Sequence, residues 1–463
     1  MWYVWMASLC VGGLLSCNSD GGEDGLGTSK DAGELREKSD STMGADSDSG
    51  RDVDVNTAPV ALPFEIEVQL ASELNPASPG TVAIVTWSVE GVSIDRAEID
   101  FGLDMQYGMT APVALADPEH RTVLLGMKPN RTYHFRVTVE SGSDVYVSAD
   151  HLIETGPATN LVTVSSEMIL PGMHEPGFII TNQFSRQQGA VAFIIDSDGE
   201  IIWWYESDIG QLSRARMSYD GKYMWLVPDR GDYASDALEA IRMDTLASYF
   251  VEDAGASHDG TSVNSDVFAY INYGEGDCGS VFEVREDGAL AEIFESSEYF
   301  PGLVPPECHM NALRYNEAEG LYTVSDRDHD IFLIDRQGEI HWQLSDIVDN
   351  TSYGAEHHGH QLLPDSIILF ANLGGAGLSS AAIEFSLTDG REIFRYDPGV
   401  FSVWLGDVQR LPEGNTLVTF SVAGEIHEVD PDGNLVRRIE IGNTLGYSMW
   451  RPTLYGPPVD LLM

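Results

Sequence analysis

The sequence predicts an all-β protein in which a six-bladed β-propeller follows a smaller β-sandwich. Glycine is abundant, with 46 residues in 463, and aromatic residues make up 10% of the chain, which favours many short strands joined by tight turns. Apolar and polar residues alternate over short runs, and the chain shows little helical periodicity. Polar residues also recur about every 50 positions in the C-terminal two-thirds, a spacing typical of one four-stranded propeller blade per repeat.

The net charge of the chain is strongly negative, at −49. Such a charge argues against nucleic acid or an anionic membrane surface as a partner and favours high solubility. A site that binds an anion must therefore do so through local positive groups, against the field of the whole protein.

Residues 1–17 read as a leader. A short apolar stretch ends in Leu14-Leu15-Ser16-Cys17, which resembles a bacterial lipobox, in which the cysteine is lipidated and becomes the mature N-terminus. The resemblance implies an exported lipoprotein, periplasmic or at the cell surface, that touches the membrane only through a lipid on Cys17. The alternative is an ordinary cleaved signal peptide.

Residues 18–58 are rich in Asp, Glu, Ser and Gly and predict a disordered acidic linker. Short alternating strands follow within residues 60–155, which read as a β-sandwich. This segment resembles a fibronectin type III module, in which Trp87 would be a core residue and Tyr133 the corner tyrosine. It contains no acid–base or nucleophile grouping, so we expect a structural or docking domain.

Residues 160–463 carry the repeats. Segments 195–203 and 334–342 share one spacing of strand, tight turn and strand, and segments 284–290 and 429–435 are looser copies. Six such hairpins are predicted, with turns at Gly199, Asp244-Thr245, Gly288, Gly338, Gly390 and Gly433. Six hairpins predict six blades. The run 447–455 has no hairpin of its own and is expected to supply the inner strand of the first blade, closing the ring.

A ladder of polar residues accompanies these repeats. His309 follows His258 by 51 residues, His358 follows His309 by 49, and Asp407 follows His358 by 49. Each precedes or begins a predicted inner strand, so all should lie at one mouth of the central channel, where Arg327 also returns. Strand alternation predicts that His309 and Asn311 project together, and that His358 and His360 do likewise. The same register brings in further arginines, namely Arg214 or Arg216, and Arg451.

Histidine, asparagine and arginine at one mouth suit a tetrahedral oxyanion. Arginine forms bidentate charge-assisted hydrogen bonds, and histidine can donate a proton or act as a nucleophile. Because the arginines repel cations, no metal site is predicted. The alternative interpretation is a set of unrelated loop histidines, since the chain has 12 of them.

These motifs together resemble the bacterial aryl-sulfate sulfotransferase (arylsulfotransferase) family of exported six-bladed propellers. The resemblance is carried, in chain order, by His258-Asp259, by His309 and Asn311, by Arg327, by the run from His358 to Pro364 before the apolar strand 367–372, and by the run from Gly406 to Leu417. It implies transfer of a sulfuryl group from a phenolic sulfate ester to a phenol, with no nucleotide sulfate donor and no other cofactor.

The resemblance also implies roles for individual residues. The sulfated histidine maps to His358, although His357 and His360 compete for that place. His258 or His309 would protonate the departing phenoxide. The group that holds the sulfuryl oxygens or the substrate would comprise Arg327, Asn311, His360 and Arg451.

Cysteine usage agrees with export. Cys10 and Cys17 belong to the leader, which leaves Cys278 and Cys308. Two cysteines in an exported chain predict one disulfide. This bond would hold the loop that presents His309.

Two other functions remain open. One is a non-enzymatic propeller lipoprotein that binds a small ligand or another protein of the cell envelope, with the histidines merely lining the channel. The other is a propeller oxidoreductase that uses a quinone cofactor or a metal, which is less favoured because no ligand set is visible in the sequence.

Overall fold

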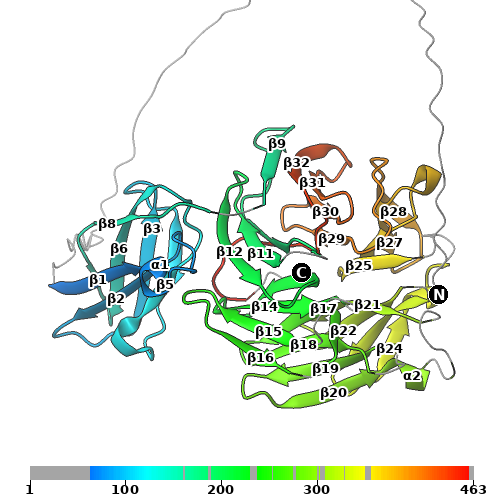
Figure 1. Ribbon diagram of the computed structural model, residues 1–463, viewed down its shortest axis with the longest axis horizontal. Helices are drawn as coiled ribbons and strands as arrows, with labels where there is room; N and C mark the ends of the chain where they lie inside the picture. The colour runs from blue at the N-terminus through cyan, green and yellow to red at the C-terminus, as the bar shows by residue number, and fades with distance from the viewer. Residues whose placement is uncertain are drawn as a thin grey trace, which may run out of the picture. The chain divides into compact units, whose positions relative to one another are not determined.

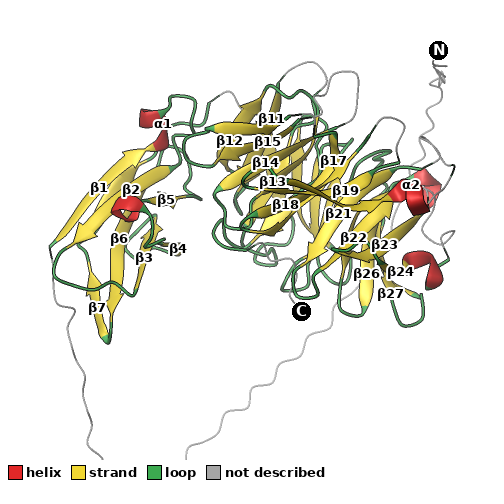
Figure 2. Ribbon diagram, turned by 90° about the horizontal axis from the view of Figure 1, so that it is seen from below, coloured by secondary structure: helices red, strands yellow, loops and turns green. Residues whose placement is uncertain are grey.

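The structure is a computed structural model. It describes residues 63–159, 162–185, 189–229, 237–252, 254–274, 278–299, 302, 308–327, 329–349 and 356–457. The predicted leader with Cys17 and the linker 18–58 lie outside these residues. Most of the described chain is in strands (Figure 2), and the helices are single turns: α1 (Ala71–Leu74), α2 (Ser296–Tyr299), and 3₁₀ turns at Pro118–His120, Leu344–Asp346 and Ala376–Leu378. No described helix has the length and apolarity needed to cross a bilayer.

The first described segment forms two antiparallel sheets around one apolar cluster. One sheet orders β1 (Phe64–Leu70), β2 (Ala83–Val89) and β5 (Thr122–Leu124); the other orders β4 (Met109–Pro112), β3 (Arg96–Gly102), β6 (Thr132–Ser141) and β7 (Asp144–Val147), with β8 (His151–Glu154) also paired to β6. Alternate residues of β6 face the cluster, as the two-residue period of a strand requires. Trp87 is buried in it, and the hydroxyl of buried Tyr133 accepts a 2.8 Å hydrogen bond from the backbone N–H of Lys128.

The described residues from Val162 onward form six antiparallel sheets, which we number as blades. Figure 1 shows them following one another in sequence order. Blade 1 contains β33 (Met449–Arg451), β10 (Phe178–Asn182), β11 (Ala190–Ile195) and β12 (Ile201–Ser207); blade 2 contains β13 (Leu212–Met217), β14 (Tyr223–Pro228), β15 (Leu238–Arg242) and β16 (Ser248–Val251). Blade 3 contains β17 (Ala256–Asn264), β18 (Val267–Asn272), β19 (Ser280–Arg285) and β20 (Leu290–Glu295); blade 4 contains β21 (Met310–Asn316), β22 (Leu321–Asp326), β23 (Asp330–Asp335) and β24 (Ile340–Gln343). Blade 5 contains β25 (His357–Leu362), β26 (Ser366–Ala371), β27 (Ala381–Ser386) and β28 (Glu392–Tyr396); blade 6 contains β29 (Asp407–Arg410), β30 (Thr416–Phe420), β31 (Glu425–Val429), β32 (Leu435–Ile441) and β9 (Val164–Met168).

Two strands from the ends of this region close the ring. β33 pairs with β10, so the C-terminal segment supplies the inner strand of blade 1, as the sequence predicts. β9 pairs with β32 and becomes the outermost strand of blade 6. The backbone of Trp450 in β33 also exchanges two hydrogen bonds with the side chain of Gln409 in β29, joining the inner strands of blades 1 and 6. The six sheets thus form a β-propeller whose ring is closed by β33, from the C-terminal end of the region, and by β9, from its N-terminal end.

All six predicted turns fall between the third and fourth strands of a blade, counted from its inner strand, and we call these hairpins the outer hairpins. Each of the five turn glycines has a positive φ, between 69° and 88°, which a residue without Cβ adopts readily. Gly338 shows a second constraint, because a Cβ there would lie 2.3 Å from the backbone oxygen of Ile293 in the neighbouring blade. The outer hairpins are therefore local structures that the sequence specifies directly.

The two-sheet segment contacts blades 1 and 2 through side chains. Thr81 donates a hydrogen bond to the carbonyl of Ile202 at 2.5 Å, and Arg121 forms an ion pair with the buried Asp244. The hydroxyl of Tyr455, just after β33, accepts a hydrogen bond from the backbone N–H of Leu125 at 2.7 Å. The segment therefore also contacts the residues that follow the strand closing the ring.

Candidate functional site: the mouth of the propeller channel

The ladder histidines lie where the inner strands of blades 3, 4 and 5 begin. His258 is near the start of β17, His309 directly precedes β21, and His358 is the second residue of β25. His258 and His309 are in direct contact, with their Nε2 atoms 2.8 Å apart and their rings perpendicular. A hydrogen bond between two ring nitrogens requires a proton on one of them, so one imidazole donates and the other accepts.

The ring of His258 is held from two sides. Ser257 Oγ lies 2.7 Å from its Nδ1, and the ring of Tyr273 packs against it at 5.2 Å between centroids. A carboxylate oxygen of Asp229 lies 3.9 Å from His258 Nε2. His258 also has a φ of +63°, which is uncommon for a residue with a Cβ.

β-Bulges interrupt the start of the inner strand in four blades. The register shifts between Leu212 and Arg214 in blade 2, between Ser257 and Gly260 in blade 3, between Met310 and Ala312 in blade 4, and between His357 and His360 in blade 5. A bulge re-aims side chains and breaks the two-residue alternation. The expectation that His309 and Asn311 project together, and that His358 and His360 do so, therefore does not hold. In the structure their side chains have different surroundings.

His358 is fixed by Asn372, which follows β26 in the same blade. Its Nδ1 lies 2.6 Å from Asn372 Oδ1, while Asn372 Nδ2 donates to the carbonyls of Ser402 and Leu405, both at 2.7 Å. These two donations identify the amide nitrogen and oxygen, so the oxygen must accept from His358 Nδ1–H. His358 Nε2 therefore carries the lone pair of the neutral ring, and no described group forms a hydrogen bond to it.

Burial lowers the pKa of His358 to about 3, and the positive charges of His309, His357 and Arg327 act in the same direction. The hydrogen bond to Asn372 opposes this shift. The ring is therefore neutral at neutral pH, and the histidines of blades 4 and 5 and Arg327 are close enough to influence one another.

His360 has different surroundings. It is fully buried, and neither ring nitrogen makes a well-aligned hydrogen bond within the described residues. Burial lowers its pKa to about 3, the charge of Arg314 adds to the effect, and a backbone contact with Thr323 opposes it. The structure thus places His360 against blade 4, below the mouth.

Arg327 and Asn311 connect the same blades through the backbone. The N–H of Arg327 donates to the carbonyl of His309 at 2.8 Å, and the N–H of His357 donates to the carbonyl of Arg327. Asn311 is buried, donates to the carbonyl of His357 at 2.7 Å and accepts from Ser325 Oγ. Both residues therefore hold the entries of blades 4 and 5 together, and Asn311 does so with its side chain.

Arg451 lies toward the other end of the channel. It is the last residue of β33, and its guanidinium donates to the carbonyls of Ser218, Thr453 and Gly456. Ser218 follows β13, at the end of that strand opposite to the mouth. The predicted partnership of Arg451 with the histidines is thus not seen.

A closed ring of four charges, three of them buried and one (Arg314) partly buried, which we call the charge ring, crosses the channel below the histidines. Asp259 pairs with Arg214 at 2.6 Å and with Arg314 at 2.7 Å; Asp407 pairs with Arg214 at 2.9 Å and also with Arg314. The four residues come from blades 2, 3, 4 and 6. Asp407, the fourth member of the ladder, therefore belongs to the charge ring and not to the mouth.

Backbone geometry supports the charge ring. Gly359 lets the β29 backbone approach β25, because a Cβ at this position would meet Asp407 Oδ1 at 2.0 Å. The nearby arginines hold the pKa of Asp259 well below its usual range in spite of its burial. Tyr447 joins the two levels: its ring lies under the Arg214 guanidinium at 4.4 Å, and its hydroxyl donates to the carbonyl of Asn311 at 2.7 Å.

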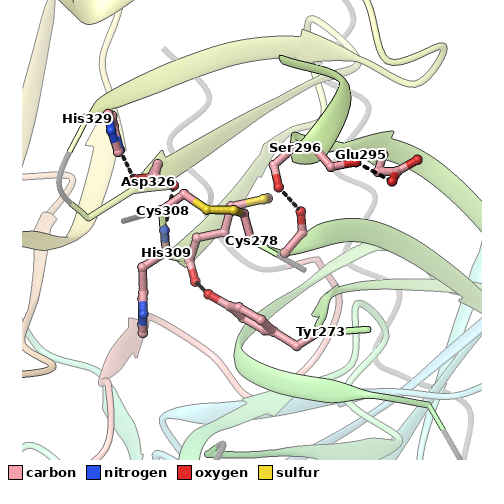
Figure 3. The surroundings of a disulfide bond; sticks show 11 residues. Tyr273, Cys278, Glu295, Ser296, Cys308, His309, Asp326 and His329 are labelled. Carbon is pink, nitrogen blue, oxygen red and sulfur yellow. Dashed lines mark hydrogen bonds and ion pairs between the residues drawn. A yellow bond between two sulfur atoms is a disulfide. The ribbon is translucent and has the colours of Figure 1, made fainter. Parts of the chain in front are cut away.

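The predicted disulfide partners lie together beside the mouth (Figure 3). Cys278 and Cys308 are bonded to each other, with Cα atoms 5.2 Å apart, and they link the segment before β19 to the residue that precedes His309. The N–H of His309 donates to Asp326 at 2.7 Å, and the hydroxyl of Tyr273 donates to the carbonyl of Met310. The disulfide and these two bonds fix the backbone on both sides of His309.

Sequence reasoning gave no role to several residues that shape the site. Asn372 appeared only as the end of an apolar run, and Arg314 and Tyr447 had no motif of their own. One available signal was position, because Asn372 follows the second strand of blade 5 as Arg327 follows that of blade 4. Within the described ranges, no three His, Cys, Asp or Glu side chains are grouped to hold a metal ion.

Comparisons with known proteins give no family for this chain. No family model matches it, and no curated protein matches it. Solved structures that are similar include a protein of unknown function from Bacteroides caccae (14% identity, TM-score 0.43, 59% of this chain and 98% of that one) and virginiamycin B lyase from Staphylococcus aureus (11%, 0.39, 60% and 88%). A third is the C-terminal WD40 domain of Sif2 (12%, 0.36, 69% and 80%). Similarity at this level carries no functional argument, and none of the three places the chain among the arylsulfotransferases.

Proposed function

We propose that the channel mouth transfers a sulfuryl group from a phenolic sulfate ester to a phenolic acceptor, with His358 Nε2 as the nucleophile. The observation that carries the proposal is the bond from His358 Nδ1–H to Asn372, which leaves the Nε2 lone pair of a neutral imidazole without a described hydrogen-bond partner. Nucleophilic histidine must be unprotonated, and this one stays so at neutral pH.

The reaction proceeds in two displacements. In the first, the His358 Nε2 lone pair attacks sulfur, an N–S bond forms, and the S–O bond to the aryl group breaks with its electrons leaving on the phenoxide. In the second, a deprotonated acceptor phenol attacks the same sulfur and the N–S bond breaks. The sulfuryl group passes between two oxygens at one oxidation state, so no cofactor, reductant or oxidant is required.

The His258–His309 pair suits the proton transfers. It holds a proton between two ring nitrogens 2.8 Å apart, a carboxylate oxygen of Asp229 lies 3.9 Å from His258 Nε2, and the charge of His309 acts on His358. One imidazole can protonate the departing phenoxide, and the pair can then accept the proton of the incoming phenol. The same pair serves both steps because they are the reverse of each other.

Arg327 is the proposed anchor for the sulfuryl oxygens. Its backbone is fixed between His309 and His357, and its charge acts on His358. A guanidinium offers a planar pair of donors to a tetrahedral oxyanion and would stabilise the charge that develops during transfer. A local positive group of this kind is needed in a protein whose net charge is −49.

The assay for this function uses 4-nitrophenyl sulfate as donor, with and without phenol as acceptor. We expect nitrophenol release that depends on phenol, and ping-pong kinetics because donor and acceptor use one pocket in turn. Arg327→Lys should recover little of the activity that Arg327→Ala loses, since a point charge does not reproduce the planar fork. No nitrophenol release from the folded protein over a panel of aryl sulfates would overturn the proposal.

A non-enzymatic binding propeller is the second candidate. It is favoured by the small exposed fraction of His358, 4%, and by the pairing of His258 with His309, which leaves the mouth polar but largely closed among the described residues. Calorimetric binding of an aryl sulfate or a phenol without turnover would select this function over transfer.

We also propose that the protein is an exported lipoprotein anchored through Cys17, and that the two-sheet segment is a docking module of the fibronectin type III kind. The lipobox-like Leu14-Leu15-Ser16-Cys17 supports the first part, and the buried Trp87 and the Tyr133 corner support the second. Cys17→Ser should move the protein from the membrane fraction to the soluble fraction. Retention in the membrane fraction would contradict lipidation at Cys17.

A further inference from the structure

The three-stranded sheet β1-β2-β5 of the two-sheet segment has apolar side chains packed on both of its faces. In β2, Val85 and Trp87 belong to the apolar cluster inside that segment, whereas Ile84 belongs to a second cluster. β5 repeats this arrangement, with Leu124 in the first cluster and Val123 packed against the second. Because successive side chains of a strand point to opposite faces, the second cluster covers the outer face of this sheet.

The second cluster is shared with the propeller. It joins side chains of blades 1 and 2, such as Trp203 and Leu226, to four residues of the two-sheet segment. Those four are at most 5% exposed, and they are Ala71, Val82, Ile84 and Leu125. Domains of one chain move relative to each other unless their interface is large and hydrophobic. Here the apolar interior continues from one part into the other, so we expect them to behave as one unit.

Ion pairs accompany this apolar contact. Arg121 pairs with the buried Asp244 of blade 2, and Lys128 Nζ lies 3.1 Å from a carboxylate oxygen of Asp196 and 3.2 Å from one of Glu200, both in blade 1. The two-sheet segment thus presents positive side chains to negative ones on the propeller. An apolar centre with polar groups around it is the usual composition of a specific interface.

The residues that follow β33 take part in the same contact. Leu454 is buried in the second cluster, and Tyr455 packs against both clusters. The Tyr455 hydroxyl accepts from the N–H of Leu125 at 2.7 Å and donates to the carbonyl of Val123 at 3.1 Å. Its donor and an acceptor lone pair are therefore both used on the backbone of β5 and the residue after it.

Arg451 connects this attachment to the strand that closes the ring. Its guanidinium donates to the carbonyls of Thr453 and Gly456 in the tail and to that of Ser218, which follows β13. The backbone of Arg451 is paired with Phe178 of β10. A displacement of the tail would therefore be transmitted to β33.

We propose that the outer face of the β1-β2-β5 sheet is an internal docking surface, whose partner is the C-terminal tail 452–456 together with blades 1 and 2, and that this contact keeps the ring closed. β33 has only 3 residues, and so short a strand forms few hydrogen bonds of its own. The tail gives it a second attachment. The inference rests on the docking role proposed above for the two-sheet segment, to which it assigns a partner, and not on sulfuryl transfer.

The test is hydrogen–deuterium exchange of the full-length protein, resolved into peptides by mass spectrometry. In Tyr455→Phe, we expect the amides of β33 and β10 to exchange at least about 10-fold faster than in the wild type, because the tail loses both hydrogen bonds to the segment. Amides of blade 4 should keep their rates. The matched control is Tyr322→Phe, which removes another buried hydroxyl, bonded to Glu283 at 2.7 Å, and should leave β33 and β10 unchanged.

Unchanged exchange of β33 and β10 in Tyr455→Phe, or a rise of equal size in blade 4, would overturn the proposal. Ile84→Ala tests the contact from the other side, since Ile84 points away from the cluster inside the two-sheet segment. This variant should also raise the exchange of β33, and a rise confined to the two-sheet segment would contradict the proposal. Neither experiment uses enzymatic activity or another protein, so failure here is distinguishable from failure of the proposed transfer.

Discussion

The mouth and the charge ring occupy successive levels of one channel, and both are built from polar residues that neighbouring inner strands contribute. In the charge ring, each carboxylate of Asp259 and Asp407 pairs with both Arg214 and Arg314, so the four charges satisfy one another. At the mouth, Asn372 takes up one nitrogen of His358 and leaves the other without a described partner. Polar side chains therefore converge at both levels. Of these groups, the one left without a described hydrogen-bond partner is His358 Nε2 at the mouth.

The two levels use their polar side chains differently. In the charge ring, the free-energy cost of desolvating the four charges is offset by their attraction to one another, so the charges serve the structure. At the mouth, the His358 ring stays neutral and the charges of His309 and Arg327 act on it, as the proposed transfer requires. The following variants test whether the two levels really differ in this way.

The largest expected effect comes from His358. His358→Gln should lower sulfuryl transfer by at least about 10³-fold, because a nucleophile cannot be replaced by positioning alone, while the unfolding midpoint should change little. The matched change is His360→Gln, two residues away in β25 and without a proposed covalent role. Comparable losses in both variants would show that the mouth acts as a structural unit.

The charge ring should respond in stability. Arg214→Met removes one cation from between two buried carboxylates, and we expect a loss of about 3–5 kcal/mol in the free energy of unfolding. Denaturation in urea measures it. The control is Arg395→Met, which breaks the exposed pair with Glu392 and should cost less than about 1 kcal/mol. A loss below about 1 kcal/mol in Arg214→Met would show that the charge ring contributes little to the stability of the protein.

The disulfide should matter to stability and to the mouth together. The Cys278→Ser, Cys308→Ser double variant should lose about 2–4 kcal/mol of stability. It should also raise the KM for the donor, because the bond fixes the backbone next to His309. Two free thiols measured by mass spectrometry in the native, non-reduced wild type would contradict this account.

Asn372 is a positioning residue, because it holds the His358 ring through Nδ1. Asn372→Ala should lower kcat by about 10- to 100-fold, because His358 loses the partner that orients its ring and fixes its tautomer. Asn372→Asp should keep the hydrogen-bond acceptor but raise the His358 pKa. As the pH is lowered, the variant should therefore lose activity at a higher pH than the wild type does. An unchanged pH profile in Asn372→Asp would assign Asn372 a structural role only.

The smallest effect concerns the pH dependence of stability. His358 and His360 both have a folded-state pKa of about 3, below the ordinary value of 6.5. The unfolded chain therefore binds more protons between these values, and stability should fall as the pH is lowered from about 6.5 toward 3. The slope of the free energy of unfolding against pH is proportional to the number of protons taken up on unfolding, and His360→Gln should reduce that number by up to about one. An unaltered slope would show that His360 already titrates normally in the folded protein.

Much of the fold could be predicted from the sequence because it is local. The six outer hairpins have tight turns with glycine or Asp-Thr at fixed places, and each turn is specified by its own residues. The inner strand of blade 4, predicted to begin at or just after His309, is found at Met310–Asn316. The assignment of segment 447–455 to blade 1 succeeded because a ring with one strand missing leaves a single place for it.

The site was less predictable because it depends on irregular backbone. The spacing of His258, His309 and His358 indicated one mouth, but the bulges at the strand entries decide which side chains share a face, and a bulge of this kind has no clear sequence signal. Asp407 satisfied the same spacing and yet lies in the charge ring. The pairing of Asp407 with Arg314, 93 residues away, depends on how the blades are arranged around the axis.

The most direct test of the central claim is to trap the covalent intermediate. The protein is mixed with an aryl sulfate in the absence of acceptor, quenched under conditions that preserve the N–S bond, digested, and mapped by peptide mass spectrometry. We predict that the peptide containing His358 gains a sulfuryl group, a mass increase of about 80 Da, in the wild type. This adduct should be absent in His358→Gln. An adduct on His360 would contradict the assignment of the nucleophile, and turnover without any histidine adduct would contradict the two-step mechanism.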